Sequence, residues 1–215
     1  MITQSHALVR GRERGVLFDV DGTLVDSAYI HTLAWWQAFR QHQHDVPMAA
    51  IHRCVGMGGA RLVDTLLPAG RDREADDDIL ASHAAVFAQS WPSLRPLDGA
   101  KELLAQCHAG GLAVALASSA RTQDLAANRR TLGADSFIHA ATSADDAKAS
   151  KPAPDIRVAA TQAVCVAAAD AGDVGAAVRG LQAAPALGRP AIDATCGGTS
   201  AAGGGRGRRL GGACL

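Results

Sequence analysis

The chain has 215 residues, of which 48% are hydrophobic and 20% are charged, and its 21 basic residues balance its 21 acidic residues. This composition fits one globular domain or a core with a smaller inserted domain, and a net charge of zero gives no electrostatic footprint for nucleic acid or an anionic membrane. No stretch approaches the roughly 18 apolar residues of a membrane span, and the N-terminus lacks the order of a signal peptide. The five cysteines are an odd number without C-x-x-C spacing, which argues against a disulfide framework or zinc site and favours free thiols in a reducing cytoplasm.

The first predicted element is a short buried strand over residues 16–18, after a lead-in of residues 1–15 that lacks apolar periodicity and is expected to be mobile. Asp19 and Asp21 follow the strand, and Gly22 allows a sharp turn. Because reactive groups in open α/β sheets gather beyond the carboxyl ends of strands, the two carboxylates can face one pocket, where a cation such as Mg²⁺ would relieve their repulsion. One carboxylate could then attack phosphorus while the other exchanges a proton. A lone D-x-D would be better explained as an acidic turn.

The longer string, residues 19–27, reads D-V-D-G-T-L-V-D-S and resembles the first motif of the haloacid-dehalogenase-like (HAD) superfamily of phosphohydrolases. The resemblance implies that Asp19 is the nucleophile and a metal ligand. It also implies that Asp21 is the general acid/base and that its backbone carbonyl binds the metal, Mg²⁺. The implied fold is α/β, a Rossmann-like, mostly parallel three-layer core with an inserted all-α cap.

Residues 27–95 are predicted to be this helical cap, beginning with a helix near Ala28 that Asp26 and Ser27 can cap. On that helix the H-x-x-A-W string at His31 resembles the start of the cap in β-phosphoglucomutase-like and phosphoglycolate-phosphatase-like members, which implies a substrate-binding role. The alternative for His31 is an ordinary surface or partly buried helical histidine.

A glycine-rich loop around Gly56 precedes a predicted helix over residues 60–67, with Arg61 in its first turn, where backbone N–H groups favour an anion. In the resembling families this loop and arginine reach over the active site, so Gly56 and Arg61 are candidate substrate-binding residues. The alternative for Arg61 is a solvated surface arginine. The acidic run at residues 74–78 is predicted to be an exposed face at a helix N-terminus and not a metal site.

Residues 91–99, with two prolines and a glycine, are predicted to return the chain from cap to core. A helix from Ala100, a buried strand over residues 112–117, a helix ending at Gly133 and a short strand at residues 137–138 are expected next. A serine after a strand is ordinarily a helix N-cap. However, the string L-A-S-S resembles the second HAD motif, which implies that Ser118 binds the transferring phosphoryl oxygen, with Ser119 as a substrate-binding neighbour.

The string K-P-A-P-D at residues 151–155 resembles the third HAD motif, so Lys151 is expected to hold a positive charge beside the phosphoryl group. The alternative is an exposed loop lysine. The fourth motif should be a strand ending in acidic residues, and Asp173 is the candidate metal ligand, with Asp170 a weaker substitute. The segment before Asp173 makes a poor strand, and Ala177 stands where many relatives carry a second acid.

The chain ends in a glycine-rich segment, and residues 201–215 are predicted to be a disordered tail. Residues 1–26 and 96–200 are the predicted core. The resemblance implies an Mg²⁺-dependent cytoplasmic phosphatase acting on a small phosphorylated metabolite of the phosphoglycolate or sugar-phosphate type. A phosphoglucomutase-type isomerase and a catalytically impaired relative with an incomplete metal site remain alternatives, and the sequence leaves the oligomeric state open.

Overall fold

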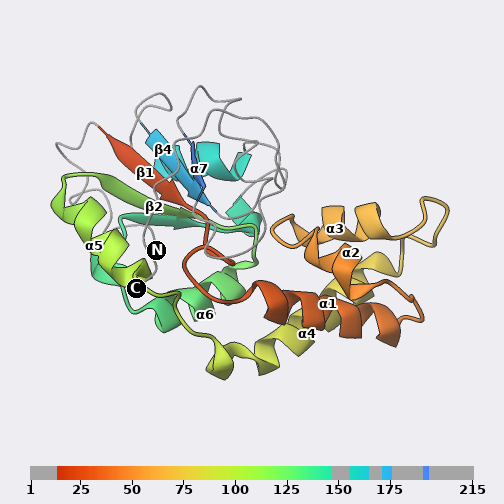
Figure 1. Cartoon of the computed structure of the whole chain (residues 1–215). Coiled ribbons are helices and arrows are strands. Elements are labelled where there is room, and N and C mark those ends of the chain that lie inside the picture. Colours follow the sequence, from red (N-terminus) through yellow and green to blue (C-terminus); the bar gives the residue numbers. More distant parts are fainter. Residues whose placement is uncertain (1–13, 147–154, 165–170, 176–190, 194–215) are drawn as a thin grey trace.

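The computed structural model describes residues 14–146, 155–164, 171–175 and 191–193. Its described strands form one parallel sheet of order β3-β2-β1-β4-β5 (Figure 1). The strands are β1 (Gly15–Phe18), β2 (Ala113–Ala117), β3 (Ala140–Thr142), β4 (Ala171–Gly175) and β5 (Ala191–Asp193). Along the chain, β2 and then β3 are added on one side of β1, and β4 and then β5 are added on its other side. The predicted parallel α/β architecture is therefore confirmed.

Strands β1 and β2 are apolar along their whole length, which suits a sheet that helices cover on both faces. One face packs on α5 (Ala100–Ala109) and α6 (Thr122–Leu132), where Phe18 and Leu116 belong to the same buried cluster as Leu104 and Leu125. The opposite face carries Leu17 and the alanines of β2, which cluster with residues 160 and 164 at the end of α7 (Asp155–Ala163). These layers are the expected helix–sheet–helix arrangement.

The structure differs from the predicted elements at several boundaries and at one strand: β2 starts one residue later than predicted, and α3 (Gly59–Leu66) starts and ends one residue earlier. Gly15 pairs with Ala113 and belongs to β1, so the strand begins one residue before the predicted start. The strand expected at residues 137–138 is wrong, because residues Asp135–Phe137 form a 3-10 turn (η2) and the strand comes later, as β3. Phe137 and Ile138 are apolar because they pack against the core cluster of β1 and β2, whereas the short, small residues of β3 make the sheet pairing.

A group of helices lies beside the carboxyl ends of the strands (Figure 1). It comprises α1 (Ala28–Gln41), α2 (Met48–His52), α3 (Gly59–Leu66), α4 (Asp76–Gln89) and the 3-10 turn η1 (Trp91–Ser93), and is called the helical unit below. It has its own buried cluster, which includes Trp35, Phe39 and Ile79, while Leu33 on α1 is exposed. The acidic run supplies the first turn of α4, as predicted. Within the described residues, no helix combines the length and apolar character needed to cross a bilayer.

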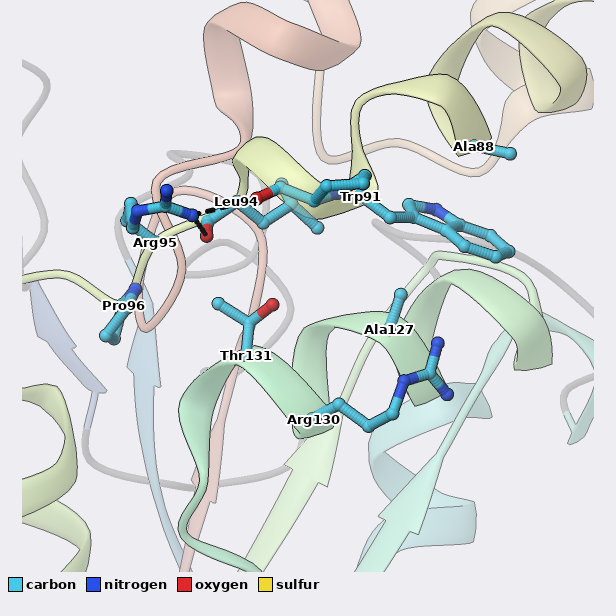
Figure 2. Close-up of a pocket in the computed structure, with 9 residues that line it drawn as sticks. Ala88, Trp91, Leu94, Arg95, Pro96, Ala127, Arg130 and Thr131 are labelled. Carbon is cyan, nitrogen blue, oxygen red and sulfur yellow. Dashed lines mark hydrogen bonds between the residues drawn. The ribbon is translucent and has the colours of Figure 1, made fainter.

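Two chain segments join the helical unit to the sheet, and they run side by side. The N–H of Asp26 donates to the carbonyl of Arg95, and the N–H of Leu97 donates to the carbonyl of Leu24, both at 2.9 Å. Figure 2 shows the return segment, where Trp91 and Arg95 face α6 across a groove of about 600 Å³. The exit and return segments thus form a hydrogen-bonded double connection at the predicted ends of the cap.

Candidate active site

Three of the predicted catalytic residues lie at the carboxyl ends of the neighbouring strands β1 and β2. Asp19 and Asp21 follow β1, and Ser118 follows β2, whose Leu116 pairs with Phe18. Gly22, with φ of +72°, makes the tight turn after the aspartates that a side chain would strain. Asp19 and Ser118 are buried, and the hydroxyl of Ser118 lies 3.4 Å from Oδ2 of Asp21. The structure therefore brings Ser118 into contact with Asp21 and places Asp19 at the same edge of the sheet, two residues before Asp21.

Besides the contact of Ser118 with Oδ2, three side chains hold Oδ1 of Asp21. Its Oδ1 accepts hydrogen bonds from the hydroxyl of Ser27 at 2.7 Å and the amide of Asn128 at 3.0 Å, and lies 3.2 Å from Nε2 of His31. Burial would raise the pKa of Asp21, but the charge of His31 and the bonds from His31, Ser27 and Asn128 outweigh it and hold the pKa well below its usual range. Asp21 is therefore a carboxylate at neutral pH.

Ser27 was expected to cap α1 with its side chain, and this expectation is wrong in detail. Ser27 does stand at the N-cap position of α1, but its hydroxyl makes no capping bond to the helix. The hydroxyl is fully buried and donates to Asp21. Ser27 therefore stabilises the carboxylate of Asp21 and not the helix end. A buried carboxylate without donors would cost more free energy than a helix N–H that lacks a cap but can reach water.

Two histidines connect Asp21 to the helical unit. Nδ1 of His31, on α1, lies 3.2 Å from Nε2 of His83, on α4, and both side chains are buried. His31 stacks on Phe87 with ring centroids 3.8 Å apart, and His83 stacks on Trp35 at 3.9 Å. Because a carboxylate only accepts, Nε2 of His31 carries the hydrogen that faces Asp21. Burial first, and then the charges of His31 and Arg121, lower the pKa of His83 well below its usual value, so His83 is neutral.

Sequence reasoning missed Asn128 and His83 as neighbours of the site. Asn128 lies three residues after Leu125 and four before Leu132 on α6, so it interrupts the apolar face of that helix. A polar residue at such a position signals a specific buried partner. His83 belongs to no motif, and its role follows only from the packing of α4 against α1.

A cavity of about 330 Å³ opens over Asp21, between the helical unit and the core. Four of the predicted residues, Gly56, Ser119, His31 and Asp21, line it. The hydroxyl of Ser119 donates to the carbonyl of Gly56 at 2.8 Å, which ties the loop of the helical unit to the sheet edge. Arg61 is exposed on α3 and is not among the lining residues, so its substrate-binding role stays a prediction.

The expected magnesium ligands are only partly within the described residues. The carboxylate of Asp19 and the backbone carbonyl of Asp21 are hard oxygen donors and fit Mg²⁺. The backbone of Asp173 pairs with Leu17, which puts it in the middle of β4 and not at the strand's end as expected. Across the ranges that the structure describes, no three His, Cys, Asp or Glu side chains form a metal-binding cluster. Lys151, Asp170 and Ala177 lie outside the described residues, as do most of the lead-in and the whole glycine-rich tail.

The chain is similar to known proteins. The chain is 29% identical over 181 residues to the protein Suppressor of Quenching 1, chloroplastic, of Arabidopsis thaliana, which is 82% of this chain and 17% of that protein. It is 26% identical over 141 residues to validoxylamine A 7'-phosphate phosphatase of Streptomyces hygroscopicus subsp. limoneus, 65% of each chain. The chain thus spans less than two thirds of the length of either relative.

The fold is shared with solved structures. A hydrolase from Pseudomonas syringae superposes with a TM-score of 0.79 at 26% identity, over 84% of this chain and 83% of that one. The family model described as haloacid dehalogenase-like hydrolase matches residues 16–193, a span that contains every candidate catalytic and metal-binding residue. The family expected from the motifs is confirmed: this chain belongs to the haloacid dehalogenase-like hydrolases.

Proposed function

We propose that this chain is an Mg²⁺-dependent phosphatase that hydrolyses a small phosphomonoester through an aspartyl-phosphate on Asp19. The observation that carries the proposal is the contact between the Ser118 hydroxyl and Asp21, at 3.4 Å, at the sheet edge where the buried Asp19 also lies. The similarity to a protein named a phosphatase supports the same reaction class. Phosphoglycolate-type and sugar-phosphate-type esters are the candidate substrates.

In this proposal a carboxylate oxygen of Asp19 attacks phosphorus and the bond to the ester oxygen breaks. The leaving alkoxide takes a proton that passes through Asp21, and water then attacks the phosphorus of the aspartyl-phosphate to release inorganic phosphate and restore Asp19. Ser118 and Lys151 hold the phosphoryl oxygens. Bound Mg²⁺, held by Asp19, the carbonyl of Asp21 and Asp173, would neutralise charge on the phosphoryl group.

The surroundings of Asp21 suit the second half of this cycle. As a carboxylate, Asp21 can take a proton from the attacking water. To protonate the alkoxide in the first half Asp21 must already carry a proton, and the proton that it takes from the attacking water in one turnover can serve the leaving alkoxide of the next. The Nε2–H of His31, 3.2 Å away, would orient the Asp21 carboxylate for both transfers, in addition to lining the substrate-binding wall.

The rest of the predicted organisation belongs to the same proposal. Residues 27–95 form a cap that covers a core made of residues 1–26 and 96–200, with Gly56, Ser119 and Arg61 contributing to substrate binding. The enzyme acts in the cytoplasm on a soluble phosphorylated metabolite, without nucleic acid or membrane partners.

One observation favours a second candidate, an impaired relative that binds Mg²⁺ weakly. Asp173 lies level with Leu17 in the register, two residues before Asp19, whereas an ion needs its ligands in near-ideal octahedral geometry. Phosphate release from a panel of phosphomonoesters, measured with added Mg²⁺ and again with a chelator, separates the candidates. The phosphatase predicts chelator-sensitive release from at least one ester. No release from any ester, combined with no rise in thermal midpoint on adding Mg²⁺, would support the impaired relative.

A further inference from the structure

The wall that the helical unit contributes to the cavity over Asp21 carries no fixed charge among the described residues. Its side chains are apolar or aromatic, including Trp35, Met57, Ala60 and Leu80. Its only ionisable members are His31 and His83, and these two face each other at 3.2 Å. Whatever lies against this wall meets an indole, a thioether and aliphatic groups, which favour contact with uncharged or apolar surface.

The start of α3 packs closely on this wall. A Cβ on Gly59 would lie 2.7 Å from Cδ2 of Leu80 and 3.3 Å from the ring of Trp35, so a side chain there would require Leu80 to shift. The glycine therefore lets α3 pack directly on Leu80 and Trp35, two of the apolar residues that line the cavity.

The opposite wall, from the core, carries more acidic than basic side chains. Among the described lining residues it carries Asp21, Asp124 and Asp145 against one cation, Arg121. The guanidinium of Arg121 donates from Nε and Nη2 to both oxygens of Asp124, at 2.9 and 3.1 Å, and the Asp124 side chain is only 2% exposed. Asp145 accepts two bonds from Thr122, from the backbone N–H and from the hydroxyl, which lower its pKa and keep it ionised. The positive charge of Arg121 is thus already paired with Asp124, Asp21 lies against His31 of the opposite wall, and the carboxylates of the core wall outnumber its one cation among the described lining residues.

We infer that the organic group of the substrate is uncharged and presents an apolar face or ring to the helical unit. This inference rests on the proposed phosphatase function and narrows its substrate class. The transferring phosphoryl group would bind at the sheet edge with Asp19 and Ser118, while the alcohol part fills the cavity between Trp35 and Arg121. A second anionic group, such as the carboxylate of phosphoglycolate or the further phosphate of a bisphosphate, meets carboxylates and no unpaired cation among the described residues that line the cavity, since Arg61 is not one of them. Of the two candidate substrate types, the neutral sugar or alcohol phosphate is therefore selected.

The test uses two esters that differ only in charge, 4-carbamoylbenzyl phosphate and 4-carboxybenzyl phosphate, with the full chain and Mg²⁺. We expect kcat/KM to be at least about tenfold higher for the neutral amide, which corresponds to about 1.4 kcal/mol. Ala60→Arg places a cation on the wall at an exposed position of α3 and should narrow or reverse the preference, while Ala60→Gln, a neutral side chain of similar reach, should not. Equal kcat/KM for the two esters, or a preference for phosphoglycolate over the amide, would overturn the inference.

A binding measurement separates this inference from the proposed function. The two alcohols themselves, 4-carbamoylbenzyl alcohol and 4-carboxybenzyl alcohol, can be titrated calorimetrically without turnover. Tighter binding of the neutral alcohol supports the inferred substrate class even if no ester is hydrolysed, in which case only the phosphatase proposal fails. Equal binding, or tighter binding of the carboxylate, contradicts the inferred class whatever the activity.

Discussion

Replacing His83 by glutamine should make the free energy of unfolding depend less on pH below neutral pH. His83 is 8% exposed, stacks on Trp35 and contacts Nδ1 of His31, and burial lowers its pKa well below the ordinary 6.5. The unfolded chain therefore binds a proton at this residue that the folded chain does not, so stability rises with pH and is lost as pH falls through the unfolded pKa. One proton corresponds to about 1.4 kcal/mol per pH unit, so wild type should lose about 1.4 kcal/mol through His83 alone on going from about pH 7.5 to about pH 5.5.

The measurement is the free energy of unfolding in urea, followed by circular dichroism, for wild type and His83→Gln at both pH values. Glutamine keeps a hydrogen-bonding group near His31 but has no proton to gain. Between the two pH values the variant should therefore lose less free energy of unfolding than wild type, and the difference should equal the contribution of His83. At the higher pH the variant should be less stable than wild type, because the stacking on Trp35 is gone. Parallel curves for the two proteins would show that His83 is protonated in the folded state and would refute the reasoning.

Two further predictions concern hydrogen bonds that join separate elements. A double-mutant cycle between Ser27→Ala and Asp21→Asn should give a coupling free energy of about 1 kcal/mol in urea unfolding. The reason is that the Ser27 hydroxyl donates to Asp21 and not to α1. Additive effects of the two substitutions would mean that Ser27 acts as an ordinary helix cap. Arg71→Ala should lower the thermal midpoint by a few degrees, because the guanidinium joins Asp64 on α3 to Asp76 on α4 at 2.6 to 2.8 Å. Arg71→Lys should recover only part of the lost thermal midpoint, since an ammonium cannot make the paired contact with Asp76. An unchanged midpoint in Arg71→Ala would show that these surface ion pairs do not stabilise the helical unit.

The sequence predicts most of the sheet edge because its signals there are local. A buried run that ends in Asp19, and another that ends in Ser118, place both residues at the carboxyl edge once the strands are parallel. The same local logic gives the start of α1 at Ala28 and the acidic first turn of α4. These features follow from the chain's own periodicity and end signals, without knowledge of tertiary contacts.

What escaped prediction depends on contacts between distant segments. The donors to Asp21 come from α1 and its N-cap residue, from the end of β2 and from α6. His83 lies 52 residues after His31 in the sequence and contacts it from another helix. The hydroxyl of Ser27 could satisfy either the helix or the carboxylate, and only the fold decides between them. The strand expected at residues 137–138 fails for a related reason, because Phe137 and Ile138 owe their apolar character to packing on the core cluster and not to strand pairing.

The central claim is that Asp19 forms the covalent phosphoryl intermediate, and Asp19→Asn tests it most directly. The amide has nearly the volume of the carboxylate but is a very weak nucleophile, so the fold should persist while chemistry stops. With a ³²P-labelled phosphomonoester and acid quenching, wild type should show hydroxylamine-sensitive label on Asp19 and steady release of phosphate. Asp19→Asn, with an unchanged circular dichroism spectrum, should show neither label nor release. Phosphate release by that variant at a rate near wild type would contradict the account.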